Sequence, residues 1–371
     1  MKKKYVLFSI VIVVLLVTFV TCFNYFKTTN NYVEDNVNNQ TKITKGISMN
    51  LEQTAGAGDY KTVTQSSWPT KGYKFNAELS RCENGSTLSW DDTKKAVIMQ
   101  GNVSDKCYVY FDKILTLAEY VISQYTGTQG DNALYYHNST LTNGAGDNSY
   151  RYAGASDSVN NYICLGSDAT TCPEANLFRI IGVFGDQTKV IRAKSVGDKQ
   201  WHTSPNNTWS SSSLNTYLNG EYLTSLGTIA EKIATTTWKV GGRSSTYLYD
   251  VPTTAYQYEV GSSASTTTYD AKIGLMYVSD YGFAADQSGW TTKLSSYGSN
   301  SSKNWLYLGS FEWTISCDSD RTYGAFSVNS AGHVDGSGVG SSIGVRPSFN
   351  LESSVKYVSG SGSMSDPVRV N

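Results

Sequence analysis

The residues of this chain most able to do chemistry are its histidines and cysteines. His137, His202 and His333 lie far apart in the sequence, and none forms the i, i+4 pair that places two metal ligands on one helix face. Each is interpreted as a surface or loop histidine rather than as a ligand. The sequence has no zinc-type ligand spacing, no Gly-x-Ser-x-Gly nucleophile turn and no phosphate-cradling glycine loop. These patterns argue against catalysis, and we predict that the protein is not an enzyme.

Four of the cysteines form two candidate pairs. Cys82 and Cys107 bracket a short segment, and outside the cytoplasm such a pair is expected to form a disulfide that contributes about 3 kcal/mol. A metal or redox site is the alternative, but no second Cys or His cluster lies nearby. Cys164 and Cys172 suggest a second disulfide, which would close a short loop.

Cys317 is the cysteine left over, because Cys22 lies in an apolar segment. A buried inert thiol, a bond to another chain and a chance substitution in a loop are all open interpretations of Cys317. A nucleophilic role does not follow, because the sequence places no base beside it.

The stretch from Trp305 to Asn350 contains the most distinctive candidate surface. Its two ends are apolar, aromatic and strand-like, whereas its middle is rich in Asp, Ser, Asn, Gly, Tyr and Arg and cannot bury enough apolar surface to be core. A polar, aromatic-studded loop on a rigid scaffold is a usual way to present a binding surface. We therefore predict a ligand-binding loop face. Its candidate residues are Trp313, Asp318, Asp320, Arg321, Tyr323, Asn329 and His333.

Plainer interpretations exist for these residues. Trp305 and Trp313 are equally suited to core packing, and the polar residues to a solvated surface. Asp318 and Asp320 could bind Ca²⁺ with nearby carbonyls, although two carboxylates alone do not specify such a site, and no other cofactor is predicted. Arg346 lies in an otherwise apolar strand and is interpreted as structural, tied to a buried carboxylate or to carbonyls.

The composition indicates a mostly β protein with long loops. Charged residues make up 16% of the 371 residues and the formal net charge is -1, so nothing favours a nucleic-acid partner. Tyr (27) and Gly (33) are abundant, as are Ser and Thr. Disorder is the alternative, but 8 Trp and 12 Phe residues are available to build cores.

The N-terminus carries a candidate membrane segment. Three lysines precede Tyr5–Phe23, a run without charged residues whose roughly 28 Å as a helix would cross a bilayer core. We predict an uncleaved single-pass anchor in the cell membrane, with the N-terminus in the cytoplasm and the bulk of the chain extracytoplasmic. A cleaved signal peptide and a lipoprotein modified at Cys22 are the alternatives.

Shifts in composition predict the domain organisation. The expected segments are the anchor (1–27), a flexible Asn- and Thr-rich stalk (28–61), a small disulfide-stapled β module (62–113), a linking helix (114–130) and a C-terminal domain (131–371). Within the last, residues 177–184 and 189–193 flank a Gly-Asp turn and predict a hairpin. Serines before residues 214–220 predict a capped helix that ends at Gly220, and residues 221–234 predict a second helix.

The order of these pieces resembles C-type-lectin-like domains of the formylglycine-generating-enzyme type. It is most similar to a related domain of unassigned function that is common in surface proteins of gut bacteria. The resemblance covers roughly residues 150–371. It rests on the hairpin, the Trp-Ser-Ser-Ser-Ser-Leu-Asn-Thr-Tyr-Leu segment that starts at Trp209, Gly241-Gly242, a strand at 273–276, Trp313 and Gly344-Val345-Arg346-Pro347.

The resemblance implies an α+β protein. The expected fold is a C-terminal C-type-lectin-like domain with a twisted antiparallel sheet, two helices and long loops, preceded by the small all-β module and the transmembrane helix. Formylglycine-generating enzymes hold copper with a pair of cysteines near the C-terminal end, whereas only Cys317 lies in that region here. Iron-dependent relatives need a face of three histidines, which the spacing of the three histidines does not favour.

These observations together predict a membrane-anchored, non-catalytic bacterial surface protein of the adhesin or receptor type. Its loop face would bind a glycan or a surface protein of another cell or host. Two alternatives stay open: an extracellular enzyme, of the formylglycine-generating or another type, and an architectural surface subunit.

Overall fold

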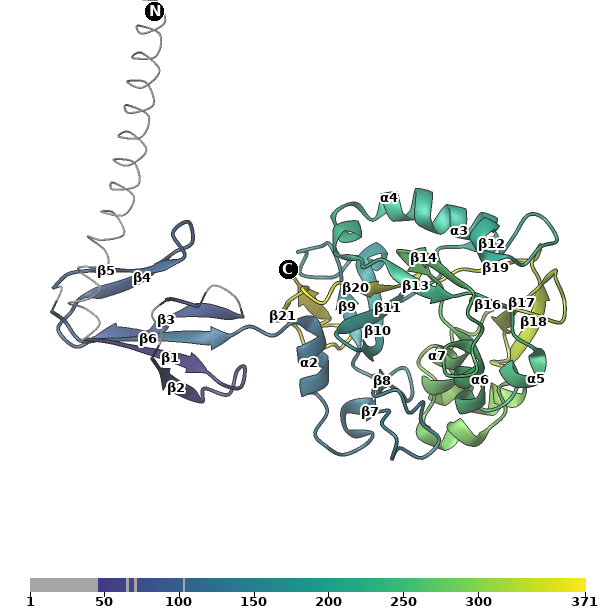
Figure 1. Ribbon diagram of the computed structural model, residues 1–371, viewed down its shortest axis with the longest axis horizontal. Helices are drawn as coiled ribbons and strands as arrows, with labels where there is room; N and C mark the ends of the chain where they lie inside the picture. The colour runs from purple at the N-terminus through teal and green to yellow at the C-terminus, as the bar shows by residue number, and fades with distance from the viewer. Residues whose placement is uncertain (1–45, 65–66, 70–71, 103) are drawn as a thin grey trace, which may run out of the picture. The chain divides into compact units, whose positions relative to one another are not determined.

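The computed structural model describes residues 46–64, 67–69, 72–102 and 104–371. These residues fall into two units of the chain, each drawn in Figure 1. Unit 1 ends at Ile114, and unit 2 spans Leu115–Asn371.

Unit 1 is built from strands in the residues that the structure describes. Its main sheet has the order β2-β1-β6-β3, with β1 and β6 parallel and the other neighbours antiparallel. A separate hairpin, β4-β5, packs its Leu88, Trp90 and Val97 against the buried Val109 and Phe111 of the sheet. The strands are β1 (Ile47–Glu52), β2 (Tyr60–Val63), β3 (Tyr73–Cys82), β4 (Thr87–Asp91), β5 (Ala96–Gln100) and β6 (Cys107–Lys113).

The position of β1 and β2 corrects the predicted stalk. Both strands begin within residues 28–61, the segment predicted to be flexible. Ile47, Met49 and Leu51 alternate with polar residues along β1, and Met49 and Leu51 lie in the core of unit 1. A strand forms here because this period-2 pattern buries one face, despite the polar composition of the surrounding segment.

Both predicted disulfides are confirmed. Cys82 of β3 is bonded to Cys107 of β6, and the two residues are direct partners in the sheet register. In unit 2, Cys164 is bonded to Cys172. The first bond joins two neighbouring strands of a unit with a small core, where a covalent link adds most to stability.

Removing the first disulfide should weaken unit 1 selectively. With Cys82→Ala and Cys107→Ala together, we expect the free energy of unfolding of unit 1 to fall by about 3 kcal/mol, because the unfolded loop regains its entropy. Hydrogen exchange followed by mass spectrometry measures this as faster exchange in β3 and β6 peptides. The control pair, Cys164→Ala with Cys172→Ala, should leave these peptides unchanged. Equal protection of β6 in both variants would contradict the prediction.

The largest sheet of unit 2 forms around the predicted hairpin. Its order is β15-β20-β11-β10-β9-β22-β21, and β8 pairs with both β10 and β7. Gly182 allows the approach of β8, since a Cβ there would lie 2.1 Å from the carbonyl oxygen of Tyr150. The strands are β7 (Leu134–Tyr136), β8 (Tyr150–Tyr152), β9 (Tyr162–Cys164), β10 (Leu177–Phe184), β11 (Gln187–Arg192), β15 (Ile273–Gly274), β20 (Ser348–Leu351), β21 (Tyr357–Ser359) and β22 (Val368–Val370).

Two further sheets complete unit 2. One has the order β12-β19-β16-β17-β18, and the other is the antiparallel pair β13-β14. A single core of buried side chains connects the three sheets, with Phe178, Trp238 and Trp313 among its largest members. The strands are β12 (Asp198–Gln200), β13 (Thr236–Lys239), β14 (Thr268–Ala271), β16 (Glu312–Cys317), β17 (Gly324–Val328), β18 (Val334–Gly338) and β19 (Ser342–Gly344).

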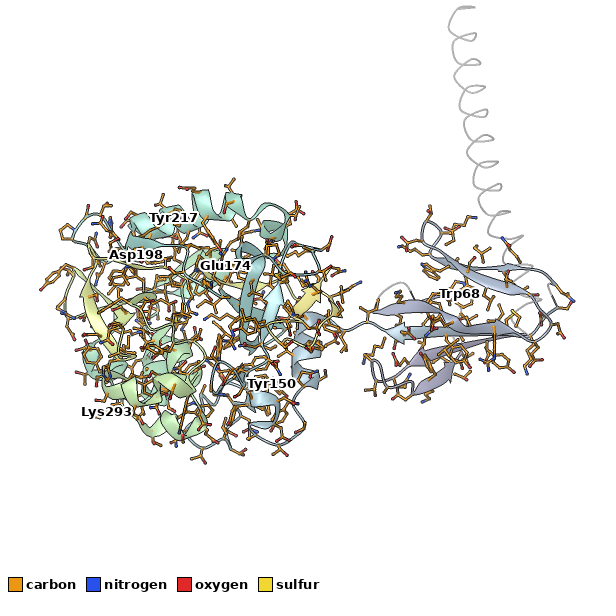
Figure 2. All side chains as sticks on the ribbon, turned by 180° about the vertical axis from the view of Figure 1, so that it is seen from behind. Trp68, Tyr150, Glu174, Asp198, Tyr217 and Lys293 are labelled. Carbon is orange, nitrogen blue, oxygen red and sulfur yellow. A yellow bond between two sulfur atoms is a disulfide. The ribbon has the colours of Figure 1, made fainter. Side chains whose placement is uncertain are left out.

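The helices of unit 2 are short. Helix α2 contacts β10 and β11, and the other α-helices lie on two sides of the sheets. The α3–α4 segment runs along one side and α5, α6 and α7 along the other (Figure 1). Tyr217 and Lys293 mark these two sides in Figure 2. The α-helices are α2 (Leu117–Ser123), α3 (Ser213–Tyr217), α4 (Leu223–Ser225), α5 (Ser245–Leu248), α6 (Pro252–Glu259) and α7 (Val278–Phe283).

The three helices predicted from the sequence correspond to helical segments in the structure, but two of them are joined into one. The linking helix forms as α2, with a capping box in which Thr116 and Glu119 bond each other's backbone amides. Ser212 caps α3 as expected, but Gly220 does not end the helix. It lies in a π-helical turn, Leu218–Tyr222, that joins α3 to α4, so one continuous helical segment replaces the two predicted helices.

The predicted fold class was wrong. Residues 131–371 contain α3 to α7 and several 3-10 helices instead of two helices, and three sheets instead of one antiparallel sheet. Two strand pairs, β9 with β22 and β16 with β19, are parallel. The missed helices are short, and α7 is buried on every side, so they lack the amphipathic repeat on which helix prediction depends.

The predicted membrane helix is also corrected. Among the residues that the structure describes, no helix is long and apolar enough to cross a membrane. This finding contradicts the predicted transmembrane helix and single-pass localisation, which we withdraw. The segment on which they rested, Tyr5–Phe23, lies outside the described residues.

Candidate functional site

The predicted loop face is largely a β-meander. Strands β16, β17 and β18 occupy residues 312–338, and all five residues of β17 are buried. Trp305, predicted to lie in a strand, is in a turn and fully buried. The polar middle enters the core because its Ala325, Phe326 and Val328 are apolar enough to form a buried strand between two neighbours.

The seven candidate residues do not converge. Trp313 is fully buried, and its Nε1 donates to the carbonyl of Lys199 at 2.9 Å. Asp318, Asp320, Arg321 and Tyr323 lie between β16 and β17, whereas Asn329 and His333 lie between β17 and β18. Successive turns of a meander are at opposite ends of its strands, so these groups are separated by the length of β17, about 17 Å.

Internal contacts occupy most of the polar candidates. Asp318, 2% exposed, accepts from Arg321 Nε and from the backbone N–H of Asp320, both at 2.8 Å. The Asp320 carboxylate accepts from Ser244 Oγ at 2.7 Å. No group of three or more His, Cys, Asp or Glu side chains in the described part of the chain is placed to hold a metal ion. Tyr323, 54% exposed, is the aromatic candidate that remains at the surface.

The histidines and Cys317 lie in different surroundings. His137 was interpreted as a surface or loop residue, but it is fully buried beside Phe283 and Trp290, with Nδ1 accepting from the Ala145 amide. Cys317 is a buried free thiol that contacts the carbonyl of Val240. Burial raises the pKa of Cys317 to about 11, which makes the thiol unreactive at neutral pH.

Arg346 has the structural role predicted for it. Its guanidinium binds both carboxylate oxygens of Glu312 and the carbonyl of Leu306, and Arg346 and Glu312 are both buried. This pair holds the turn that follows Trp305 against β16.

A different part of unit 2 brings polar and aromatic side chains together. A pocket of about 280 Å³ is lined by residues from β8, β10, β11, β13, α6, α7 and β20. Its ionisable side chains are Asp147, Arg151, Lys189, Lys239 and Asp280, and its aromatic side chains are Phe184, Trp238, Tyr256 and Tyr277. We call it the Lys189 pocket.

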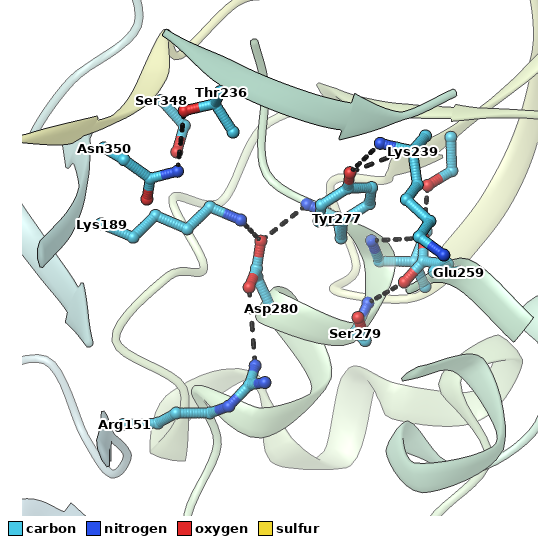
Figure 3. Close-up of polar contacts among 12 residues, drawn as sticks. Arg151, Lys189, Thr236, Lys239, Glu259, Tyr277, Ser279, Asp280, Ser348 and Asn350 are labelled. Carbon is cyan, nitrogen blue, oxygen red and sulfur yellow. Dashed lines mark hydrogen bonds and ion pairs between the residues drawn. The ribbon is translucent and has the colours of Figure 1, made fainter. Parts of the chain in front are cut away.

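The floor of the Lys189 pocket is a network of buried charges (Figure 3). Lys189 Nζ donates to Asp280 Oδ2 at 2.5 Å, and Arg151 Nη1 lies 3.7 Å from Asp280 Oδ1. Arg151 also bonds Asp147 Oδ2 at 2.6 Å. Two cations and two anions therefore neutralise one another at a depth where an unpaired charge would be costly.

The fold around α7 fixes Asp280. Its Oδ2 accepts from the backbone N–H of Tyr277, the residue that caps α7. The next two amides, of Val278 and Ser279, donate to the buried carboxylate of Glu259. Burial raises the pKa of Glu259, although these hydrogen bonds oppose the shift. The start of α7 is thus held by two carboxylates, which gives Asp280 a single orientation.

Aromatic rings enclose both cations. Lys189 Nζ lies 4.7 Å from the ring centre of Tyr277 and 5.5 Å from that of Trp238. The Arg151 guanidinium lies 4.6 Å from Phe184 and 5.3 Å from Tyr256. Cation–π contacts of this kind hold each cation in place while leaving its unused N–H groups available.

Burial and charge shift the ionisation of the network. Burial lowers the pKa of the Lys189 ammonium, while Asp280 opposes that shift. Burial tends to raise the pKa of Asp147, but Arg151 and hydrogen bonds from Ser149 outweigh it and lower this pKa to about 2. Asp147 is therefore ionised throughout the physiological pH range.

Several polar atoms of the pocket have unused hydrogen-bonding capacity. Asn350 Nδ2 donates to Thr236 Oγ1 at 3.0 Å, but its Oδ1 is buried and has no partner among the described residues. Asp280 Oδ1 has Arg151 nearby at 3.7 Å, which is too long for a hydrogen bond. Lys189 uses one N–H in its bond to Asp280. The pocket thus offers both donors and acceptors to a small molecule.

Sequence reasoning missed this site, although a signal was present. Lys189 precedes Val190 and Ile191 in the buried middle of β11, and Asp280 lies in the largely apolar run from Tyr277 to Phe283. A charged residue within such a run marks a buried, paired group. The sequence did not indicate which residues would pair, because their elements are distant in the chain.

Comparison with known proteins gives one match. Residues 185–353 match the model of a domain family described as "Domain of unknown function (DUF6273)", which is less than half of the chain. The matched region includes Lys189, Trp238, Asp280 and Asn350 but not Arg151. No curated protein and no solved structure matches the chain. The resemblance to C-type-lectin-like domains stays a prediction.

Proposed function

We propose that the protein is a non-catalytic binding protein whose unit 2 holds one sugar residue of a glycan in the Lys189 pocket. The four charges of the pocket floor neutralise one another and Lys239 adds a single positive charge to the lining, so the pocket favours a polar group with little or no charge. Each hydroxyl group of a sugar both donates and accepts a hydrogen bond. Adjacent hydroxyls can therefore bond Asp280 Oδ1 and a free N–H of Lys189 at the same time.

Size and shape support the same ligand class. About 280 Å³ is at the small end of the range for ligand pockets, which suits a single ring rather than an extended chain. Phe184 and Tyr256 are half-buried, so part of each ring is available at the pocket. Aromatic surface beside fixed polar groups gives contact area at low entropic cost, as in many recognition sites.

The observation that carries the proposal is the unpartnered Oδ1 of Asn350. A buried acceptor without a donor costs about 1–3 kcal/mol. The atom is closed to solvent in the unliganded protein, so a ligand hydroxyl that bonds it as the side chain turns toward the pocket recovers that energy on binding. The bond from Nδ2 to Thr236 keeps the side chain beside the pocket.

A glycan array screened with the full-length protein tests the proposal. We expect a set of glycans that share one sugar residue to bind, and Asn350→Ala to bind them at least ~10-fold more weakly, since one buried hydrogen bond is lost. Isothermal titration calorimetry with the best-binding glycan measures the ratio.

The control variant is Tyr323→Ser, which removes the exposed aromatic side chain of the originally predicted loop face. Binding equal to that of the unaltered protein is expected for Tyr323→Ser. The proposal fails if Tyr323→Ser loses binding while Asn350→Ala keeps it, or if no glycan on the array binds.

A further inference from the structure

Unit 2 contains a second and larger cavity, away from the Lys189 pocket. Its volume is about 610 Å³, and it lies among α2, the turn before β7, the end of β8 and the segments that carry Asp286 and Lys303. The residues used in the argument below are Tyr120, Gln124, Asn132, Tyr135, Tyr152, Asp286 and Lys303. We call it the Tyr152 cavity.

Two tyrosine hydroxyls in this cavity have no hydrogen-bond partner. Tyr135 is 9% exposed and Tyr152 is 4% exposed, yet neither hydroxyl bonds any described residue. The buried Tyr281 and Tyr297, by contrast, donate to the carbonyls of Gly332 and Gly282 at 2.9 and 2.7 Å. Both hydroxyl oxygens remain accessible from the cavity, so each is free to donate and to accept a hydrogen bond with an occupant.

A strained turn forms one wall of the Tyr152 cavity. Asn132 and Ala133 have positive φ values of 54° and 57°, a conformation that is uncommon for non-glycine residues. The turn is held in place because the amide of Ala153 donates to Ala133 at 2.9 Å and the Asn132 side chain donates to Gln124 at 2.8 Å. Strained backbone conformations that neighbouring hydrogen bonds hold in place are found most often at binding and active sites.

The charges at the cavity balance. Asp286 and Lys303 are its charged residues, with one charge of each sign. Asp286 Oδ1 accepts from the amide and hydroxyl of Ser288, whereas Oδ2 has no partner among the described residues. The Lys303 side chain is exposed, and its positive charge helps to lower the pKa of Asp286, after the larger effect of the hydrogen bond from Ser288. A neutral ligand with many hydroxyl groups can use both.

We propose that the Tyr152 cavity is a second binding site, for a neutral oligosaccharide. A phenol hydroxyl both donates and accepts, as does each sugar hydroxyl, so the two surfaces match in either direction. The greater volume accommodates more than one sugar ring. The site is separate from the Lys189 pocket, because Arg151 and Tyr152 are neighbours on β8 and their side chains point to opposite faces.

The test is a double variant, Tyr135→Phe with Tyr152→Phe, in the full-length protein. The probes are soluble neutral oligosaccharides of two to four hexose units, screened by saturation-transfer NMR and then titrated by calorimetry. We expect one or more probes to bind, and the double variant to bind them about 10-fold more weakly, because two hydrogen bonds are lost. Its unfolding temperature without sugar should be unchanged or higher, because both deleted hydroxyls lack partners.

Two controls separate this site from the others. Tyr281→Phe deletes a hydroxyl that donates to Gly332, so we expect a lower unfolding temperature with unchanged binding. Asn350→Ala alters the Lys189 pocket alone and should leave binding of these probes in place. The inference is overturned if no probe binds, if the double variant binds as tightly as the unaltered protein, or if Asn350→Ala alone removes the binding.

Discussion

Replacing Asp280 by asparagine should lower the free energy of unfolding of unit 2 by about 3–5 kcal/mol, the usual cost of leaving a buried charge without its partner. The exchange keeps the shape of the side chain and its bond from the Tyr277 amide, but it leaves Lys189 buried without a counterion at 5% exposure. Urea denaturation followed by near-ultraviolet circular dichroism measures the difference.

Two further variants identify the cause of this loss. Asp270→Asn changes an exposed carboxylate that bonds Thr237, and we expect less than about 0.5 kcal/mol from it. Lys189→Met combined with Asp280→Asn removes both charges. We expect the free energy of unfolding of this double variant to lie close to that of the unaltered protein. If Asp280→Asn were as stable as Asp270→Asn, the network of Lys189, Asp280 and Arg151 would not be the paired, desolvated cluster described here.

Replacing Arg346 by methionine should have a similarly large effect, again about 3–5 kcal/mol at pH 8. Arg346 is 1% exposed and binds both oxygens of Glu312, so the variant leaves a carboxylate buried alone. Burial already raises the pKa of Glu312, and Arg346 is the group that opposes this shift. Without it the pKa of Glu312 rises further.

The pH dependence of this variant has a definite sign. A carboxyl whose pKa is raised on folding contributes stability below its unfolded pKa and loses it as the pH rises through the folded value. The loss in free energy of unfolding caused by Arg346→Met should therefore be smaller at pH 5 than at pH 8. Adding Glu312→Gln removes the charge and should abolish the difference between the two pH values. A deficit that is constant with pH would contradict the assignment of the cost to Glu312.

The parts of the fold that sequence predicts well are those with local signals. The β10-β11 hairpin follows from two apolar runs around a Gly-Asp turn, and α2 follows from helical spacing between Leu117 and Val121. Both disulfides follow from the spacing of cysteines. Ile47, Met49 and Leu51 also carried a clear alternation, which the polar composition of residues 28–61 concealed.

The parts that sequence predicts poorly depend on contacts between distant residues. Residues 318–338 are polar enough to suggest a loop, but β17 is buried because β16 and β18 cover it on both sides. Gly220 suggests a helix end, whereas a π-helical turn carries the chain past it. Short helices such as α5 and α7 have too few residues to show a repeat.

The candidate site shows the same limit more strongly. Each of Arg151, Lys189, Asp280 and Asn350 is a single polar residue in its own segment, and nothing local links the four. Their meeting is set by the pairing of β8 with β10, of β11 with β20, and by the position of α7. Composition predicted a binding surface with aromatic residues within residues 305–350, and it gave no indication of the Lys189 pocket.

A crystal structure of the full-length protein with its best-binding array glycan is the most direct test of the central claim, which is that the Lys189 pocket receives a sugar. We expect one sugar ring inside the pocket, with neighbouring hydroxyls within hydrogen-bond distance of Asp280 Oδ1 and Asn350 Oδ1. A glycan bound at the outer surface beside Tyr323, with the pocket holding no part of it, would contradict the claim.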